Sequence, residues 1–286
     1  MRNRTVILAA LWIFAALFAA PVSDGGQVLS IKPEAVPAYQ PKFYPFKGGE
    51  KAVYRASWNG LVSVATAEIY TTPTVVAGRQ VYNVQVKAKT SRALDLIWKM
   101  RDTIHSTFDA KALMPSRFRF HQWENSRVIH TEARYSDSTK RWTVTRQQVG
   151  KRMKSYEFDS QNTLDPLTAV YLARSIDFRT GDRLYFKLFG GRYRYLLELH
   201  IEGKEPVSLE SGKTVEAYRI VPRLQNVSKR GYAERMNEAV IWISADERRI
   251  PIKLSSKIVF GSVYLELIDD KHATQSTSIQ PPKPAS

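Results

Sequence analysis

Turn signals recur along this chain at intervals of about 8–12 residues, and short alternating segments lie between them. Residues 52–58 place a small or aromatic side chain at every second position, which is the period of a half-buried strand. Asn59-Gly60 follows, and this dipeptide favours a hairpin because both central residues of a type I′ turn need positive φ. The spacing predicts a mainly antiparallel all-β fold, a large barrel or half-barrel-like sheet.

The same reading can be extended along the chain. The strands that it predicts are 52–58, 61–72, 82–88, 102–109, 116–123, 127–136, 140–148, 151–159, 183–189, 193–201, 206–210, 213–221, 235–244, 248–260 and 262–268. Residues 91–100 are expected to form one or two helical turns, because Leu94, Ile97 and Trp98 share a helical face. No repeat of fixed period is visible, so we expect a single β domain at residues 46–270.

One segment, residues 164–174, predicts a buried helix near 165–175. Asp165 is a good N-cap, and Pro166 stands at the first helical position, where its missing N–H is not needed. The segment is apolar on nearly all sides, which is typical of a buried helix. A large antiparallel sheet must close or protect its edges, and a helix that fills an incompletely closed barrel would do so.

Two side chains of this helix constrain its surroundings. Tyr171 lies among the apolar positions and is expected to be buried. Arg174, at the end of the helix, can satisfy the terminal carbonyl groups. Alternatively Arg174 pairs with a buried carboxylate, and Glu50 and Asp102 are the candidates.

The N-terminal end has the layout of a secretory signal peptide. Arg2 and Arg4 precede an apolar run at residues 6–20 that ends in small residues. The run is shorter than the roughly 20 residues that a spanning helix needs, so an uncleaved membrane anchor is the second reading. We expect residues 1–23 to direct export to the periplasm.

Proline-rich segments flank the expected domain. Residues 24–45 carry four prolines among polar residues and are expected to form an extended linker. Residues 271–286 contain three prolines among small polar residues and are expected to be a disordered tail.

Charge and cysteine content narrow the class of protein. The sequence has no cysteine, which excludes disulfides, thiol catalysis and a lipid-modified N-terminal cysteine. The formal net charge is +16 and falls to +14 without Arg2 and Arg4, so an anionic partner or simply solubility in an anionic envelope is implied. Phospholipid, lipopolysaccharide or a polyanionic glycan would fit, whereas nucleic acid would not suit an exported chain.

Several short motifs resemble the DUF3108 family of exported bacterial proteins, which has no assigned function. They are Phe46–Glu50, Tyr54, Trp58–Gly60, residues 102–109, Met114-Pro115, Leu164–Arg174, Gly181-Asp182, Trp242–Asp246, Arg249–Pro251 and Gly261. The resemblance covers roughly residues 46–268 and implies no catalytic residues. It also suggests a fold similar to LolA/LolB-like half-barrels, which handle lipid or lipoprotein ligands.

Some of these motif residues are expected to have structural roles. Trp58, Trp98 and Trp242 are interpreted as core anchors, in preference to ligand-stacking groups. Gly60 belongs to the first hairpin turn, and Pro251 is expected at the start of a strand or on an edge.

Basic and aromatic residues alternate in two predicted strands, which suggests a binding site. If aromatic side chains line the inner face, arginines lie on the outer face, either as a solvated surface or as the basic rim of an apolar cavity. The candidate ligand-binding residues are Arg117, Arg119, Arg192, Arg194, Lys151 and Arg152. Such a cavity would suit an amphiphile with an anionic head.

Catalytic and metal-binding signals are weak. His130 and Glu132 share one face of a predicted strand, but no third metal ligand lies at a telling spacing, so no metal or cofactor is expected. Asp102 and His105 are expected on opposite strand faces, and no nucleophile elbow or phosphate-binding loop is present.

Three functions follow from the sequence. The first is non-catalytic binding of an anionic lipid or another envelope component in the periplasm, with contact to a membrane surface. The second is a structural or assembly partner of envelope proteins that carries no small ligand. The third, a hydrolase, has least support, and the oligomeric state is left open.

Overall fold

The computed structural model describes residues 29–159, 161–228, 239–258 and 261–272. Within these residues, fifteen strands form one sheet. The strands are β1 (Glu50–Trp58), β2 (Val62–Val76), β3 (Arg79–Thr90), β4 (Arg101–Asp109), β5 (Pro115–Glu124), β6 (Arg127–Ser136), β7 (Arg141–Gln148), β8 (Lys154–Asp159), β9 (Thr163–Leu164), β10 (Arg183–Phe189), β11 (Arg194–Ser208), β12 (Thr214–Asn226), β13 (Val240–Ser244), β14 (Pro251–Ile258) and β15 (Gly261–His272). The helical elements are η2 (Pro33–Ala35), α2 (Arg92–Asp95) and α3 (Pro166–Arg174).

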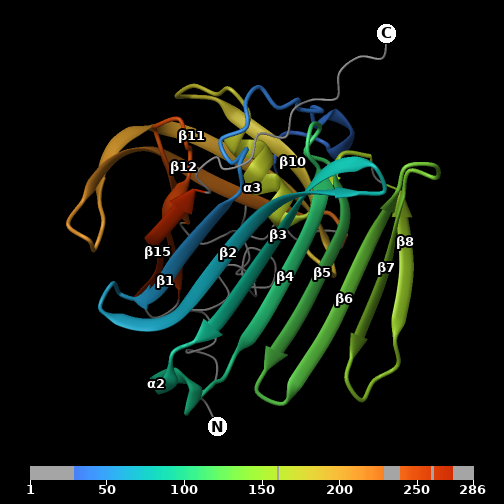
Figure 1. Cartoon of the computed structure of the whole chain (residues 1–286), viewed down its shortest axis with the longest axis horizontal. Coiled ribbons are helices and arrows are strands. Elements are labelled where there is room, and N and C mark those ends of the chain that lie inside the picture. Colours follow the sequence, from blue (N-terminus) through green and yellow to red (C-terminus); the bar gives the residue numbers. More distant parts are fainter. Residues whose placement is uncertain (1–28, 160, 229–238, 259–260, 273–286) are drawn as a thin grey trace.

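The first and last strands, β1 and β15, are neighbours in the middle of this sheet. The strand order runs from β8 down to β1, continues with β15 and then runs down to β9 (Figure 1). Neighbouring strands are antiparallel except for β9 and β10. The two edge strands, β8 and β9, follow each other in the chain but share no ladder. The all-β prediction is confirmed, and the barrel is left open between β8 and β9.

Most predicted strands occur close to their expected bounds, with one instructive exception. Asn59 and Gly60 have φ values of 51° and 73°, as the first hairpin turn requires. Residues 206–210, in contrast, are not a separate strand. They lie at the end of β11, because the register shift between Ile201 and Gly203 bends the strand without ending it.

The expected flanks are only partly within the described residues. Outside them lie the signal sequence at 1–23, residues 24–28, residues 235–238 and 259–260 of two predicted strands, and residues 273–286 of the tail. The first two residues of the expected tail, 271 and 272, belong instead to β15. Residues 29–45 do not simply lead away from the domain. Leu29 and Val36 are buried against Leu196 of β11, and the Tyr39 hydroxyl accepts a hydrogen bond from the Tyr185 amide at 3.0 Å.

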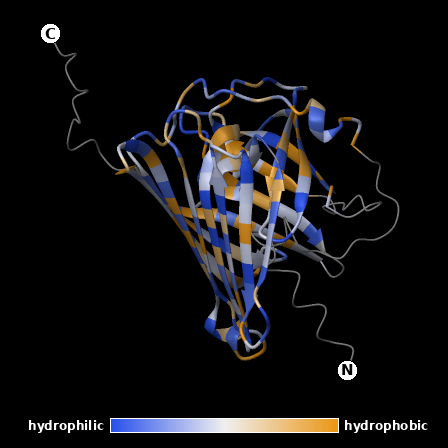
Figure 2. Cartoon of the chain, turned by 90° about the vertical axis from the view of Figure 1, so that its right-hand side faces the viewer, coloured by the Kyte–Doolittle hydropathy of each residue, from blue (hydrophilic) through white to orange (hydrophobic). Residues whose placement is uncertain are grey.

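The concave face of the sheet carries the main core. Ile104 and Phe108 of β4 alternate with outward-facing polar residues and pack with Leu167 and Leu172 of α3. Figure 2 shows the apolar helix enclosed by the wide upper part of the sheet. A depression beside Tyr39 holds only about 50 Å³, which is too small for an acyl chain. Buried side chains of α3 and of the sheet thus occupy this part of the barrel.

The start of α3 is fixed to the sheet by its N-cap. Asp165 accepts hydrogen bonds from the Leu167 and Thr168 amides at 2.9 and 3.1 Å, as the sequence predicted. Its second carboxylate oxygen accepts from the hydroxyls of Thr168 and of Ser106 in β4, at 2.7 and 2.6 Å. Burial raises the pKa of Asp165 against the opposing effect of these hydrogen bonds.

The end of α3 is fixed to β1 by a buried ion pair. Arg174 donates to both carboxylate oxygens of Glu50, with the Nη2–Oε2 distance at 2.9 Å, and to the Arg248 carbonyl oxygen. Tyr171 donates to Glu50 at 3.1 Å and is hydrogen-bonded to Thr71 of β2. Burial opposes the charge of Arg174, but Glu50 leaves the Arg174 pKa raised.

This contact decides between the two partners that the sequence offered for Arg174. Glu50 is the partner, and Asp102 instead accepts a hydrogen bond from the Trp123 amide at 2.8 Å. The predicted helix is confirmed as a buried element that spans from β4 to β1 and β2.

We predict that Arg174→Met destabilises the fold by about 3–5 kcal/mol, because it leaves the Glu50 charge buried without its guanidinium. The double variant Glu50→Gln, Arg174→Met should recover part of this loss. Urea denaturation followed by circular dichroism measures both. Arg141→Met is the control, because the Arg141–Glu157 pair is exposed and should contribute no more than about 1 kcal/mol. Equal losses in the two single variants would contradict the buried ion pair.

Candidate functional site

The opening between β8 and β9 is bridged by side chains and not by a β ladder. Phe189, at the end of β10, packs on Phe158 of β8 and on Trp142 of β7, with ring centroids 5.2 and 6.4 Å apart. The Tyr156 hydroxyl of β8 donates to the Arg192 carbonyl oxygen at 3.3 Å. We call this region, where β7 and β8 meet the β10–β11 hairpin, the seam.

A glycine allows the hairpin to sit on the concave wall. Gly191 has a φ of +86°, and a Cβ placed there would come within 3.6 Å of Phe118 and Thr131. These are ordinary packing distances, so it is the positive φ that favours glycine at this position. The turn at Gly190-Gly191 therefore brings Arg192 and its neighbours over the inner face of β5 and β6.

Three arginines and two tyrosines gather at the seam. We define this seam cluster as Arg146, Tyr156, Arg192, Tyr193 and Arg194. The Arg192 guanidinium lies 4.7 Å from the Tyr193 ring centroid, and the Arg194 guanidinium lies 5.3 Å from that of Phe158. Among the described residues, none of the three arginines has a carboxylate within ion-pair distance.

The cations of this cluster lie close to one another. Glu34 and Asp159 line a pocket together with Arg194, but neither forms an ion pair with it. Arg146 lies directly across the ladder from Lys154, which is a like-charge pair. Burial lowers the pKa of Arg146, and the nearby charges of Arg192 and Arg127 lower it further. Burial raises the pKa of Tyr156, while Arg146, Arg192 and Arg194 act against that rise. An anion at this position would relieve the repulsion and would find guanidinium and hydroxyl donors.

Two carboxyl groups lie lower on the same concave wall. Burial raises the pKa of Asp102 to about 7, against the hydrogen bond from the Trp123 amide. Burial also raises the pKa of Glu124. The positive charge of Arg127, whose Nη1 lies 3.9 Å from Glu124 Oε2, acts against this rise. Near neutral pH, therefore, Asp102 is only partly ionised and does little to neutralise the cations.

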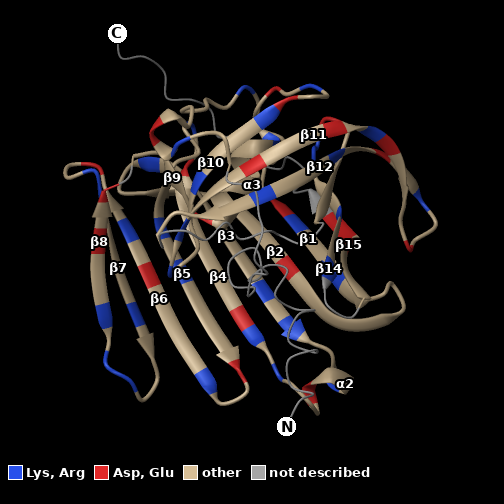
Figure 3. Ribbon diagram, turned by 180° about the vertical axis from the view of Figure 1, so that it is seen from behind, with Lys and Arg blue, Asp and Glu red and all other residues tan. Residues whose placement is uncertain are grey.

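The six candidate residues from the sequence lie in three separate places. Arg192 and Arg194 belong to the seam cluster, whereas Lys151 and Arg152 lie at the exposed β7–β8 turn, which is blue in Figure 3. Arg117 and Arg119 lie on the convex face, as their alternation with Phe118 and Phe120 indicated.

The two convex-face arginines differ in their surroundings. Arg117 pairs with Glu132, which also binds Arg134, at 2.7 and 2.8 Å. Arg119 has no ion pair among the described residues and borders an open groove of about 400 Å³. The other polar residues of this groove include His105, His121, His130, Glu132 and Gln147.

Arg146 and Tyr156 were not identified from the sequence. Arg146 has the same strand parity as Trp142 and Val144, which are buried, so the alternation alone places Arg146 on the inner face. Tyr156 has the same relation to Phe158 in β8. A basic residue at an inward position was the available signal, but only the fold places Arg192 next to it.

Among the residues that were expected to have structural roles, the prediction for Trp58 is wrong. Trp58 is 40 % exposed and is not a core anchor, because it ends β1 immediately before the turn at Asn59-Gly60. Trp98 is buried, and Trp242 is half-buried and donates to Glu205 at 2.6 Å. Pro251 begins β14, as expected.

No further chemistry is indicated by the described part of the chain. It contains no group of three potential metal ligands, and His130 stacks on His121 at a centroid distance of 4.4 Å. It also contains no helix with the length and hydropathy required to span a bilayer.

Comparisons with known proteins identify the family and support the fold. The family model described as "Protein of unknown function (DUF3108)" matches residues 53–268. A comparison with curated proteins found no match. The β-barrel-like protein of the domain of unknown function DUF1849 from Brucella abortus aligns with a TM-score of 0.50 at 10% identity, over 79% of this chain and 98% of that one. This likeness extends to the fold alone.

Two further solved structures are more distant. A candidate exported protein with a YmcC-like fold from Bacteroides fragilis has a TM-score of 0.36 at 7% identity, over 81% of this chain and 99% of that one. A candidate lipoprotein from Parabacteroides distasonis has a TM-score of 0.34 at 9% identity, over 82% and 100%.

The raised pKa of Asp102 predicts a pH dependence of stability. Between its unfolded pKa of 3.8 and its folded pKa of about 7, the folded state binds more protons, so stability falls as pH rises through this window. Asp102→Asn keeps an acceptor for the Trp123 amide and removes this ionisation. We expect the free energy of unfolding of the variant to exceed that of wild type by about 1–3 kcal/mol at about pH 8 and to differ little at about pH 4. Urea denaturation at both pH values measures it. A constant difference at both pH values would contradict the assignment.

Proposed function

We propose that this chain, which belongs to the DUF3108 family of unknown function, is an exported, non-catalytic protein that binds an anionic component of the cell envelope at the seam cluster. The observation that carries the proposal is the group of three arginines without carboxylate partners in the described structure, gathered at the only break in the described sheet. The motif of a signal peptide at residues 1–23 supports export.

The half-buried position of Arg146 is the feature that most favours a bound anion. A half-buried guanidinium beside Lys154 and other cations raises the free energy of the folded state unless an anion compensates it. Exposed surface cations need no such explanation, because water and salt screen them. The partial burial and inward position of Arg146 therefore favour a bound anion over simple solubility.

The chemistry of the cluster favours a phosphate or carboxylate group. Guanidinium groups form bidentate hydrogen bonds with these anions, and the Tyr156 and Tyr193 rings offer an amphipathic wall. Among the described residues, core side chains pack around α3, and the depression beside Tyr39 is too small for an acyl chain. We therefore propose that the protein holds the anionic head of an amphiphile and does not enclose its apolar part.

A second candidate function is the docking of other envelope proteins without any small ligand. The filled upper barrel and the unpaired edge of β8 favour it, because an edge strand offers free backbone groups to another chain. Charged residues along β8, such as Lys154, Glu157 and Asp159, also discourage indiscriminate pairing at this edge.

We predict that gently isolated wild-type protein carries a stoichiometric anionic lipid, and that Arg146→Gln, Arg192→Glu lowers its content by about tenfold or more, because two of the three guanidinium groups are lost. Mass spectrometry of a solvent extract, made without detergent, measures the lipid. The control Arg117→Glu, Arg119→Glu changes the same charge type on the convex face and should keep the lipid.

Each outcome has a distinct meaning. Loss of lipid only in the Arg117 and Arg119 variant would move the site to the convex groove. A clean extract from wild type would contradict lipid binding and would leave the docking function, for which pull-down from envelopes with and without β8 edge substitutions is the next test. Thermal denaturation confirms that each variant is folded.

A further inference from the structure

Four hairpin connections lie at one end of the sheet. Because β1 to β8 are successive antiparallel neighbours, every second connection falls on the same side (Figure 1). We call this side the tip edge and define it by residues 58–62, 89–101, 122–128 and 147–154. It includes the β1–β2, β3–β4, β5–β6 and β7–β8 connections.

Exposed apolar side chains are concentrated on the tip edge. Leu96 is 90 % exposed, Leu61 is 87 % exposed and Ile97 is 66 % exposed. The large exposed hydrophobic residues of the tip edge are Trp58, Leu61, Val62, Leu96, Ile97, Trp123, Val149 and Met153. In the described structure the others are Val75 and Val76 in the β2–β3 hairpin at the opposite end, and Ile268 in β15. This uneven distribution differs from the scattered exposure normal for a soluble surface.

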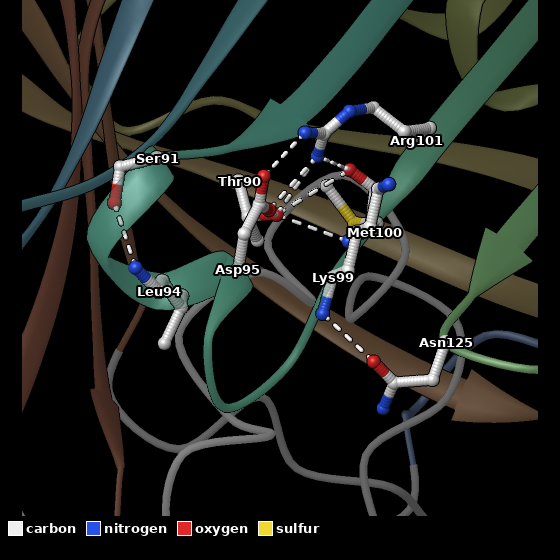
Figure 4. Close-up of polar contacts among 8 residues, drawn as sticks. All are labelled: Thr90, Ser91, Leu94, Asp95, Lys99, Met100, Arg101 and Asn125. Carbon is white, nitrogen blue, oxygen red and sulfur yellow. Dashed lines mark hydrogen bonds and ion pairs between the residues drawn. The ribbon is translucent and has the colours of Figure 1, made fainter.

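The connection that carries Leu96 and Ile97 is held in a defined conformation. Ser91 caps α2 by accepting from the Leu94 amide, and Arg101 binds Asp95 and the Thr90 hydroxyl (Figure 4). The pKa of Asp95 is lowered to about 2, first by its hydrogen bond with Arg101. The exposed pair is therefore displayed by a structured loop.

A second hydrogen-bonded link joins two of the connections. The Lys99 backbone amide donates to the Asn125 side-chain oxygen at 2.8 Å (Figure 4). The Asn125 backbone amide donates in return to the Lys99 carbonyl oxygen at 2.8 Å. The Lys99 ammonium lies 5.4 Å from the Trp123 ring centroid. The β3–β4 and β5–β6 tips thus form one unit with apolar and basic groups side by side.

The charge of the tip edge is strongly positive. Its four segments contain eight lysines and arginines and only Asp95 and Glu124 as carboxylates. Figure 2 shows hydrophobic and hydrophilic residues next to each other at the narrow lower end of the molecule. Apolar side chains that can enter a bilayer interface, surrounded by cations that attract anionic headgroups, are the features of a membrane-surface contact.

We infer that the tip edge docks on an anionic lipid bilayer, with Leu61, Leu96, Ile97 and Trp123 entering the interface and the basic residues contacting headgroups. A bilayer fits better than a protein partner, because the exposed apolar residues come from all four connections and share them with eight lysines and arginines.

Docking in this way would bring the seam cluster close to lipid. Lys154, which faces Arg146 across the ladder, belongs to the tip edge, so the lower end of the seam lies at the membrane side. This last step rests on the proposed function, since it makes the bilayer the place where an anionic amphiphile enters or leaves the cluster. The docking itself does not depend on it.

The experiment is cosedimentation of the protein, secreted and processed in the periplasm of an expression host, with lipid vesicles. We expect binding to vesicles of phosphatidylglycerol and phosphatidylethanolamine, weaker binding at high salt and little binding to phosphatidylcholine alone. Leu96→Asp, Ile97→Asp should weaken binding by about tenfold or more, since both apolar contacts are lost. The matched control Val75→Asp, Val76→Asp alters the opposite end and should bind as wild type does.

Failure of this inference can be told apart from failure of the proposed function. The seam variant Arg146→Gln, Arg192→Glu should still bind vesicles, and the Leu96 and Ile97 variant should still carry lipid if it was loaded before isolation. Absence of wild-type binding to anionic vesicles would overturn the inference. Equal weakening in the two aspartate variants would overturn it as well, because it would show that the tip edge has no special role.

Discussion

The contact between Arg174 and Glu50 holds helix α3 against the sheet. The sheet does not close through backbone hydrogen bonds, so its curvature depends on what fills it. Helix α3 does so, and it is attached at one end through Asp165 to Ser106 and at the other through Arg174 and Tyr171 to Glu50. Burying these charges is costly, and their specific geometry fixes the position of the helix more than it adds net stability.

The position of the opening follows from the same arrangement. After β8 the chain forms the short strand β9, which pairs only with β10, and then α3 inside the sheet, so β8 and β9 are left as the two edges. Aromatic packing of Phe189 on Phe158 and Trp142 joins the edges instead. Since side-chain contacts impose no ladder, this is also where cationic side chains from two distant segments can meet.

Features set by residues close together in the sequence were predicted well, whereas contacts between distant segments were not. Alternation and turn chemistry are local, and they predicted most strands, the Asn59-Gly60 turn and the capped helix at Asp165 and Pro166. Two local predictions failed. The break expected between residues 201 and 206 is a register shift inside β11, and Trp58 is an exposed aromatic residue at a strand end and not a core residue. The choice of Glu50 over Asp102 and the meeting of Arg146 with Arg192 depend on contacts between distant segments, which periodicity does not contain.

The pairing of β1 with β15 affects how the chain can fold. Their partnered residues are separated by roughly 200 positions, so the loop-closure entropy of this ladder is paid late. During synthesis from the N-terminus, β1 has β2 on one side and must wait for the last strand on the other. Viewed as a cycle, the strand order is a simple meander that starts at β9 and ends at β8. A circular permutant that joined the natural ends and began at β9 would keep every sheet neighbour and make all of them consecutive.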